Sequence, residues 1–438
     1  MEFYGLIGEK LGHSLSEPIH RMFFEMMGIE GAYKLVEIPR ERLGKLGGAM
    51  RLLGVRGMNV TIPYKQAIMA QLDAVDDMAR RVGAVNTLLL RDGKISGHNT
   101  DVEGLRALMV RHKIPVQGAV AVILGTGGVS RAALEVLLSG GVKTIYYVSR
   151  DKAGKGVPDE RVICVDYQDL EELSGDILIN CTPVGMFPKA DACPVKREII
   201  ARFEHLVDTI YNPLETVFLK IGRELGKNTC NGLYMLVAQA MAAQAIWQGQ
   251  AVPGEVTERI YQRLRDQMEP VRRVFLIGMM GCGKTTLGRA LAERLKLDFV
   301  DMDDEIVRMS GKTIPELFEQ GETVFREWES RACEGLSRRK NLVVAAGGGA
   351  PLNARTLRAM KSNGGLVLYN DRPVERIARD IDASCRPLLA DGPEKLYELA
   401  KTRAPRYAEA ADLTVFNDAG PGAALEKMVT ALKGVWQI

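Results

Sequence analysis

Two glycine-rich loops constrain the fold of this chain more than any other feature of the sequence. LGTGGVSRA occupies residues 124–132, and GMMGCGKTT occupies residues 278–286. Each loop follows a short apolar run and precedes an amphipathic stretch, which is the order of strand, tight turn and helix. A turn of this kind presents backbone N–H groups at a helix N-terminus to the phosphates of a ligand. The chain is therefore expected to hold two nucleotides in two separate units.

The rest of the chain repeats the same alternation of strand and helix. Short runs rich in Val, Ile and Leu end at Gly, Asn or another polar residue, and the clearest of them lie at residues 119–124, 144–148, 176–180, 274–278, 341–346 and 365–370. Such runs are typical of buried parallel strands joined by helices. We predict α/β architecture throughout.

Length and composition exclude several classes of protein. A chain of 438 residues is too long for one ordinary core, and 46% hydrophobic with 26% charged residues excludes a disordered chain. The net charge of +3 gives no reason to expect nucleic acid or an anionic membrane as a partner. We see neither a signal peptide nor an apolar run that could span a membrane, so a cytoplasmic protein is expected. The seven cysteines are widely spaced without a CxxC pair, and free thiols are expected.

A linker is predicted at residues 267–272. Ile260, Leu264 and Met268 are spaced by four and form one apolar stripe of a helix. The Glu-Pro pair that follows should stop this helix before a new strand begins. A softer boundary is expected within residues 101–118.

The first glycine-rich loop reads as a dinucleotide site. Gly125 allows the tight turn, Gly127 lets the backbone approach a pyrophosphate, and the following helix is expected to start near Val129. Gly128 belongs to the same loop, while the third position of the glycine fingerprint is Ser130.

The end of the next strand bears on the choice of cofactor. Arg150, with Ser149 and Lys152 beside it, is placed to bind a 2′-phosphate and favours NADP. Asp151 favours NAD instead, and a solvated charged loop is the alternative interpretation of this segment.

Four polar stretches before this loop supply hydroxyls, amides, one Lys and one Asp, the groups expected to bind a small polyhydroxylated acid. They are GHSLSE (12–17), NVTIPYK (59–65), GAVNT (83–87) and GHNTD (97–101). Three more motifs follow the loop, INCTPVGM (179–186), VDTIYNPLET (207–216) and NGLYMLVAQA (231–240). With these motifs in this order, residues 1 to about 265 resemble shikimate dehydrogenase.

The resemblance implies NADPH-dependent reduction of 3-dehydroshikimate to shikimate. It implies a substrate domain at residues 1–101, completed by helices at about 231–266, and a Rossmann NADP domain at residues 102–230. Lys65 and Asp101 would form the catalytic pair. The substrate contacts would be Ser14, Ser16, Asn59, Thr61, Asn86, Tyr211 and Gln239, and the cofactor contacts Gly125, Gly127, Gly128, Val129, Ser149, Arg150, Lys152 and Gly232.

The second loop satisfies the pattern GxxxxGK[ST] between a strand and a helix, which predicts a nucleoside triphosphate site. Lys284 would reach the β- and γ-phosphate oxygens, and Thr285 would ligate Mg²⁺. The full set of expected ATP contacts is Gly278, Met280, Gly281, Cys282, Gly283, Lys284, Thr285, Thr286 and Arg386.

Other motifs of the second half indicate which molecule accepts the phosphoryl group. Asp301 and Asp303 are two apart at a strand end, so we expect both to face one pocket. FREWE (325–329) places an Arg and a Glu on one helical face, and AAGGGAP (345–351) ends a strand in glycines. SCRPLL (384–389) and KTRAPRY (401–407) add arginines in segments that we expect to be mobile. As an ordered set these motifs resemble shikimate kinase over residues 271–438.

This second resemblance implies a P-loop domain of the NMP-kinase type with a parallel sheet at residues 273–438. Asp303 would bind the acceptor hydroxyl, Asp301 would join Thr285 at the metal, and Arg386 would act on a lid over ATP. Glu329 would hold Arg326 in place. The expected contacts to shikimate are Asp303, Arg326, Gly348, Gly349 and Arg403.

The two resemblances together predict two consecutive reactions on one polypeptide, with NADP(H), ATP and Mg²⁺ as cofactors and small acids as the only substrates. One alternative is a dehydrogenase fused to a degenerate, regulatory kinase-like module, and another is a first half that acts on quinate. Neither nucleic acid nor a membrane is expected as a partner. The sequence leaves open whether the chain forms a homodimer.

Overall fold

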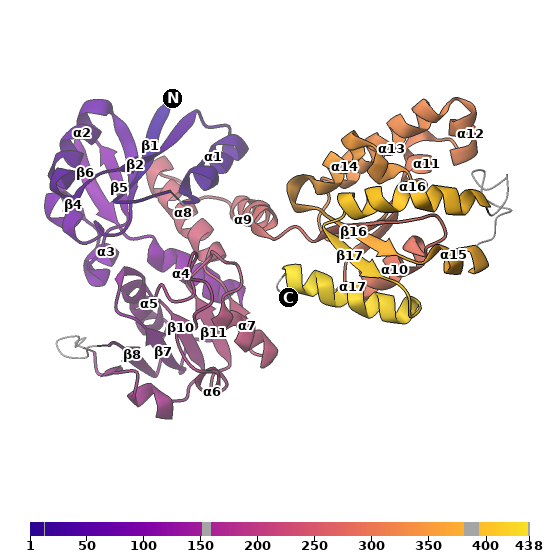
Figure 1. The fold of residues 1–438 in the computed structure, drawn as a ribbon. Helices are drawn as coiled ribbons and strands as arrows, with labels where there is room; N and C mark the ends of the chain where they lie inside the picture. Colours follow the sequence, from indigo (N-terminus) through magenta and orange to yellow (C-terminus); the bar gives the residue numbers. More distant parts are fainter. Residues whose placement is uncertain (13, 151–158, 381–393, 437–438) are drawn as a thin grey trace. The chain divides into compact units, whose positions relative to one another are not determined.

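The computed structural model describes residues 1–12, 14–150, 159–380 and 394–436. The chain divides into two compact units, Met1–Glu269 and Pro270–Ile438, and each is described by itself (Figure 1). Within the described ranges, no helix combines the length and apolar character needed to cross a membrane. The predicted α/β architecture is confirmed in both units.

The first unit begins with a mixed six-stranded sheet in the order β2-β1-β3-β5-β6-β4. Its strands are β1 (Glu2–Gly8), β2 (Gly31–Glu37), β3 (Val55–Val60), β4 (Ala74–Val75), β5 (Thr87–Arg91) and β6 (Lys94–His98). The helices of this part are α1 (Ser16–Met27), α2 (Leu46–Leu53) and α3 (Asp77–Val82), with short 3₁₀ turns at η1 (Arg40–Lys45) and η2 (Ala67–Gln71). β5 is antiparallel to both β3 and β6, while β1 is parallel to its two neighbours.

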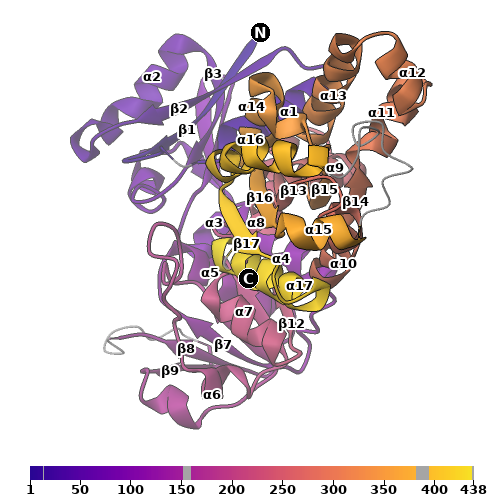
Figure 2. The same cartoon turned by 45° about the vertical axis from the view of Figure 1, so that its right-hand side comes forward.

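α4 (Asp101–Arg111) leads into a second sheet, which is parallel throughout and has the order β12-β11-β10-β7-β8-β9. Its strands are β7 (Val120–Leu124), β8 (Thr144–Val148), β9 (Val162–Val165), β10 (Ile177–Asn180), β11 (His205–Asp208) and β12 (Asn228–Cys230). Its helices are α5 (Gly128–Ser139), α6 (Arg197–Ile200) and α7 (Val217–Glu224), with a 3₁₀ turn at η3 (Asp169–Glu172). Two apolar cores form, one with α4 and α5 and one with α6 and α7 (Figure 2). The strand order is that of a Rossmann fold, and the chain reverses direction across the sheet between β7 and β10.

Two helices at the end of the unit return to the first sheet. These are α8 (Leu233–Gln248) and α9 (Gly254–Met268), and both share an apolar core with β1 and α1. The contact is closest at Gly57 of β3, where an added Cβ would lie 2.2 Å from Trp247 Nε1. Trp247 is buried and its Nε1 donates to the Leu88 carbonyl oxygen at 2.9 Å. The α8 backbone is therefore fixed against the first sheet.

The second unit is built on a five-stranded parallel sheet in the order β14-β15-β13-β16-β17. The strands are β13 (Arg273–Ile277), β14 (Asp298–Asp301), β15 (Leu342–Ala345), β16 (Leu366–Asp371) and β17 (Leu413–Phe416). α10 (Lys284–Leu295) and α17 (Pro421–Trp436) pack on one face. The other face carries α11 (Met302–Ser310), α12 (Ile314–Glu319), α13 (Glu322–Leu336), α14 (Ala354–Lys361), α15 (Val374–Asp380) and α16 (Glu394–Ala410), with 3₁₀ turns at η4 (Ala350–Leu352) and η5 (Ser362–Gly364) (Figure 1).

Replacing Gly57 with alanine tests the contact between α8 and the first sheet. The added methyl group would overlap the Trp247 indole, and overpacking of this kind costs about 1–3 kcal/mol of unfolding free energy. We expect Gly57→Ala to lower the urea concentration at which the first unit unfolds. Gly48→Ala in α2 is the matched control, because a Cβ there meets no atom within 4 Å. Equal unfolding midpoints for both variants and the wild type would contradict the packing described.

Candidate functional site

Lys65 and Asp101, the predicted catalytic pair, form an ion pair inside the first unit. Lys65 Nζ donates to Asp101 Oδ2 at 2.6 Å, and the two side chains are only 15% and 3% exposed. Asp101 is the first residue of α4, where the helix dipole stabilises a carboxylate. The fold thus holds an acid where it orients the ammonium group of Lys65.

Asn86 organises the polar groups around this pair. Its Nδ2 donates to Asp101 Oδ1 at 3.0 Å and to Thr100 Oγ1 at 3.1 Å. The same Nδ2 lies 3.4 Å from Gln239 Oε1, which comes from α8. The Thr100 backbone N–H donates to Asn86 Oδ1 at 2.8 Å. Four of the predicted residues, Lys65, Asp101, Asn86 and Gln239, therefore form one connected cluster.

Gln239 reaches the cluster because α4 and α8 cross at a short distance. Gly104 lies at the crossing, where an added Cβ would sit 2.6 Å from the Met235 carbonyl oxygen and 2.9 Å from Gln239 Cβ. A side chain at this position would push α8 away from α4 and move Gln239 away from Asp101. Gly104 does not have a positive φ, so the backbone conformation would accept another residue. The close packing of the two helices is what requires a glycine here.

A second group of predicted residues lies beside this cluster. Asn59 Nδ2 donates to Thr87 Oγ1 at 3.1 Å, and Asn59 Oδ1 accepts from the Tyr33 hydroxyl at 2.8 Å. Burial raises the pKa of Tyr33 and a hydrogen bond with Ser16 opposes the rise, which places Tyr33 next to Ser16. Ser14 Oγ in turn donates to Ser16 Oγ at 3.1 Å. The predicted serines and Asn59 thus lie around one tyrosine that the sequence analysis did not single out.

Thr61 and Tyr211, the remaining predicted substrate contacts, both pack against other parts of the first unit. The Thr61 methyl group would be 2.8 Å from a Cβ at Gly8. Tyr211 is half-buried against the core shared by α1 and α8, and burial raises its pKa. Gly232, predicted as a cofactor contact, precedes α8 and leaves no room for a side chain, because a Cβ would lie 2.1 Å from the Thr209 carbonyl oxygen.

The first glycine-rich loop lies at the topological switch point of the Rossmann sheet. Gly125 follows β7 with φ +94°, and an added Cβ there would lie 2.9 Å from Thr182 Cγ2 beyond β10. Gly127 caps α5, whose first residues are Gly128 and Val129. The N–H groups of a first helical turn have no partner within the helix, and α/β sheets bind ligands in the crevice at such a switch point.

Ser130 occupies the position of the third glycine in the dinucleotide fingerprint. Its side chain is buried, and its hydroxyl forms hydrogen bonds within the protein. Its Oγ donates to the Gly127 carbonyl oxygen at 2.6 Å and contacts the Tyr147 hydroxyl at 2.8 Å. The hydroxyl therefore ties the loop to β8 instead of leaving room for closer packing.

The structure describes only part of the segment that we predict to bind a 2′-phosphate. Ser149 is buried directly after β8, and its backbone N–H donates to the Val165 carbonyl oxygen at 3.0 Å. Arg150 is exposed. Lys152 lies outside the described residues.

A buried carboxylate supports the loops on the other side of this crevice. Asp208 Oδ1 accepts from Asn180 Nδ2 at 3.1 Å, and Asp208 Oδ2 accepts from the Thr216 hydroxyl at 2.7 Å. Burial raises the pKa of Asp208 to about 6, although these hydrogen bonds oppose the shift. Asn180 Oδ1 also accepts from Thr182, next to the glycine-rich loop. The sequence analysis missed this network, but both Asn180 and Asp208 end buried parallel strands, which is a readable signal.

In the second unit, the predicted phosphate loop joins β13 to α10. Lys284 Nζ donates to the carbonyl oxygens of Gly278 and Met279 at 2.9 and 3.0 Å. Gly278, Gly281 and Gly283 have φ values of +146°, +77° and +94°, which side chains rarely tolerate. Met280 and Cys282 are buried in the apolar core, while Thr285 and Thr286 are exposed on the first turn of α10.

Asp301 and Asp303 are close together, but the predicted reason is wrong. Only Asp301 belongs to β14, whereas Asp303 lies in the first turn of α11. Asp301 caps this helix, since its Oδ1 accepts from the Asp303 backbone N–H at 3.1 Å. Aspartate favours the N-cap position, which ends the strand earlier than the alternation suggested. Thr285 Oγ1 donates to Asp301 Oδ2 at 2.7 Å, so the two predicted metal ligands are adjacent.

Arg326, Glu329 and the glycines after β15 form a tight group. Arg326 Nη1 donates to Glu329 Oε2 at 2.9 Å, and the Glu329 side chain is 1% exposed. A Cβ at Gly349 would lie 2.3 Å from Arg326 Nη1. A Cβ at Gly347 would lie 2.8 Å from Glu329 Oε1 and 3.6 Å from Asp303 Oδ1, so Asp303 borders the same group. Burial raises the pKa of Glu329, while the Arg326 charge opposes the rise.

Arg403 completes this side of the site, from the second of the two arginine-bearing segments. Residues 401–407 lie within α16, whose many Ala, Glu, Leu and Lys residues sustain the helix through Pro405. Arg403 Nη1 would lie 3.8 Å from a Cβ at Gly348, and the neighbouring Tyr407 hydroxyl donates to the Gly348 carbonyl oxygen at 2.6 Å. Arg386 lies outside the described residues.

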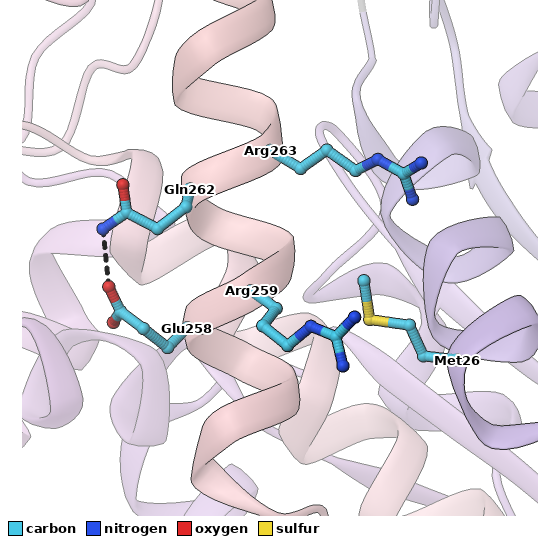
Figure 3. Close-up of a pocket in the computed structure, with 5 residues that line it drawn as sticks. All are labelled: Met26, Glu258, Arg259, Gln262 and Arg263. Atoms are coloured by element: carbon cyan, nitrogen blue, oxygen red, sulfur yellow. Dashed lines mark hydrogen bonds between the residues drawn. The ribbon is translucent and has the colours of Figure 1, made fainter.

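A shallow hollow on the first unit involves none of the predicted site residues. It is lined by Met26 of α1 and by Glu258, Arg259, Gln262 and Arg263 of α9 (Figure 3). Gln262 Nε2 donates to Glu258 Oε1 at 2.6 Å. Glu258 also binds Arg111 of α4, whose guanidinium lies over the Tyr234 ring. These contacts hold α9 to the rest of the unit.

The pKa of Asp208 gives a test of the buried network. The pKa of Asp208 is about 6 in the folded state and returns to its ordinary, lower value in the unfolded state. The free energy of unfolding therefore falls as pH rises from about 4 to 7. Asp208→Asn removes this loss, so we expect the variant to gain in unfolding free energy relative to the wild type over that range. Urea unfolding at several pH values measures the difference. Asp191→Asn, which removes an exposed carboxylate, is the comparison variant, and a flat profile for Asp208→Asn would contradict the assignment.

Comparison with known proteins agrees with this geometry. The family model for the shikimate dehydrogenase substrate binding domain matches residues 6–88, and that for shikimate kinase matches residues 280–433. A shikimate dehydrogenase (NADP(+)) of Clostridium beijerinckii is 47% identical over 270 residues, which make up 61% of this chain and 100% of the relative. One from Caldanaerobacter subterraneus is 38% identical, covering 60% of this chain and 97% of the relative.

Solved structures give the same result for the first unit. Shikimate dehydrogenase 1 from Peptoclostridium difficile is 48% identical with a TM-score of 0.59, covering 61% of this chain and 99% of that one. A chorismate mutase/shikimate 5-dehydrogenase fusion protein from Clostridium acetobutylicum is 41% identical with a TM-score of 0.60, covering 61% and 98%. The chain therefore belongs to the shikimate dehydrogenase family through its N-terminal part and carries a shikimate kinase domain in its C-terminal part.

Proposed function

We propose that this chain catalyses two consecutive reactions, the NADPH-dependent reduction of 3-dehydroshikimate to shikimate and the ATP-dependent phosphorylation of shikimate to shikimate 3-phosphate. The observation that carries the proposal is that the residues we assign to the two reactions lie grouped in the two units of one chain. Lys65 is paired with Asp101 in the first unit, and Asp303 lies beside Arg326 and Glu329 in the second. The product of the first reaction is the acceptor of the second.

Lys65 and Asp101 fit the chemistry of ketone reduction. Negative charge develops on the carbonyl oxygen during reduction, and an ammonium group stabilises that charge and supplies the proton. Asp101 keeps Lys65 oriented through the 2.6 Å ion pair. Asn86 is within hydrogen-bond reach of the same carboxylate and of Gln239, so the remaining groups of the two amides can bind ring hydroxyls. Ser14 and Ser16 would bind the substrate carboxylate.

The glycine-rich loop of the first unit fits a dinucleotide. The φ of Gly125 and the short approach to Thr182 leave space for a pyrophosphate only while position 125 has no side chain. NADPH, when bound there, supplies the hydride. Arg150 is exposed at the carboxyl end of β8 and provides a charge for a 2′-phosphate. The curated relatives carry the name shikimate dehydrogenase (NADP(+)), which supports the same cofactor here.

Asp303, Arg326 and Arg403 fit the recognition of a hydroxy acid. The two guanidinium groups approach adjacent glycines, and a planar guanidinium pairs well with a carboxylate. Glu329 is buried and holds Arg326 by an ion pair of 2.9 Å. Asp303 lies on the same side, where it can accept the proton of the attacking hydroxyl.

The loop after β13 fits a nucleoside triphosphate with its metal ion. Thr285 Oγ1 and Asp301 Oδ2, 2.7 Å apart, are hard oxygen ligands of the kind that Mg²⁺ prefers. ATP with Mg²⁺ supplies the phosphoryl group. Lys284 is held at the loop by two carbonyl oxygens and is placed to bind phosphate oxygens. The chain retains Lys284, Asp303 and Arg326, which weighs against a degenerate kinase module.

Product analysis tests the two reactions together. The full chain is incubated with 3-dehydroshikimate, NADPH, ATP and Mg²⁺, and products are followed by mass spectrometry. We expect shikimate 3-phosphate with matched consumption of NADPH and ATP. Shikimate that accumulates without phosphorylation would contradict the kinase assignment, and faster oxidation of quinate than of shikimate in the reverse direction would contradict the substrate assignment.

Two variants of the same chain serve as each other's controls. Lys65→Met should lower dehydrogenase kcat by at least about a hundredfold, the usual contribution of a general acid, while shikimate phosphorylation continues. Asp303→Asn should stop phosphorylation while reduction continues. A variant that lost both activities would report damage to the whole chain instead of a catalytic role.

A further inference from the structure

A contact joins the cofactor helix of the first unit to the segment that carries Lys65. Arg131 lies on the first turn of α5, immediately after the buried Ser130. With the amide oxygen of Gln66 turned toward the guanidinium, that oxygen accepts hydrogen bonds from both Nη1 and Nη2 of Arg131, each at 3.1 Å. Gln66 directly follows Lys65 in the sequence.

Arg131 also packs over the end of α3. Gly83 caps this helix with φ +67°, and a Cβ there would lie 2.9 Å from Arg131 Nη1. A side chain at position 83 would therefore meet the guanidinium as well as being strained. Nearby, Arg81 Nε of α3 donates to Glu135 Oε1 of α5 at 3.0 Å, so the two helices lie against each other here.

The Lys65 segment makes two further contacts, one with the loop before β5 and one with α5. The Val85 backbone N–H donates to the Lys65 carbonyl oxygen at 2.8 Å, which ties Lys65 to the loop that carries Asn86. The Lys65 side-chain stem approaches α5, since its Cδ would lie 3.8 Å from a Cβ at Gly128. The ammonium group is thus held by Asp101 and the backbone by Val85, while the stem lies near the first residue of α5.

We propose that Arg131 is a positioning residue that ties the cofactor helix α5 to the Lys65 segment through Gln66. The first turn of α5 is where the pyrophosphate of the dinucleotide would bind, and the same turn carries the guanidinium that holds the residue after Lys65. Arg131 fixes the distance between the cofactor loop and the proton donor. This inference rests on the proposed role of Lys65.

The direction of the guanidinium distinguishes this role from phosphate binding. Both terminal nitrogens of Arg131 face Gln66 and Gly83, which belong to the substrate side of the crevice. A phosphate ligand would instead compete with Gln66 for these donors. The two roles predict opposite kinetic changes, because a positioning residue acts on kcat whereas a phosphate ligand acts on the affinity for NADPH.

The experiment compares Arg131→Met, Arg131→Lys, Gln66→Leu and the double variant Gln66→Leu/Arg131→Met in the full chain. Steady-state kcat and KM for NADPH and 3-dehydroshikimate are measured, together with the isotope effect from NADPH deuterated at the transferred hydrogen. NADPH titration by fluorescence confirms that each variant is folded and binds cofactor. Arg81→Met is the matched control, because it removes an arginine from the same α3–α5 contact without touching Gln66.

We expect Arg131→Met and Gln66→Leu each to lower kcat about fivefold, with NADPH affinity changed less than about twofold, because each removes hydrogen bonds to a charged group. The double variant should be no worse than either single one, since both remove the same contact. The isotope effect should rise as hydride transfer limits the rate more, Arg131→Lys should recover part of kcat, and Arg81→Met should stay close to wild type.

Three outcomes would overturn the inference. Tenfold weaker NADPH binding in Arg131→Met with unchanged kcat would make Arg131 a phosphate ligand. Additive losses in the double variant would show that the two residues act separately. Wild-type kinetics in all four variants would show that Arg131 and Gln66 have no role in the reaction. Lys65→Met measured in parallel separates these results from failure of the proposed catalytic assignment, because an active Lys65→Met would contradict that assignment whatever the Arg131 variants show.

Discussion

The buried ion pair between Lys65 and Asp101 is the interaction on which the first unit depends for its chemistry. Two opposite charges that are this little exposed are costly to place unless their remaining atoms are hydrogen-bonded. Asn86 meets that requirement at Asp101, and the short crossing at Gly104 brings Gln239 to Asn86. The pair therefore explains why two helices and two loops distant in sequence converge on one point.

The second unit also contains a buried ion pair, but both of its residues lie on the same helix. Glu329 is more deeply buried than Asp101, and it is stabilised by Arg326 on its own helix one turn away. The glycines after β15 then let the guanidinium approach the backbone directly. Local helix spacing places this pair, whereas the Lys65–Asp101 pair needs the whole substrate domain to be folded.

Sequence patterns predicted much of this arrangement. The apolar runs gave the parallel strands, and the glycine loops lie at the carboxyl ends of β7 and β13, as expected for α/β sheets. Helix capping by Asp301 and the helix through Pro405 were not predicted, because each depends on local hydrogen bonding and on the balance of a whole segment. Arg131 could not be assigned a role either, since its partner Gln66 lies far away in the sequence. Asp208 was missed although its place at the end of a buried strand is a sequence signal.

The division of the chain at Glu269 and Pro270 has a consequence beyond catalysis. The first unit has two sheets and the second has one, and each unit has its own apolar cores, so each has its own balance of folded and unfolded states. Cellular proteases act on a polypeptide as a whole once any part of it is open. The less stable unit therefore sets the lifetime of both enzymes, and a mutation that weakens packing in one half lowers the abundance of the other.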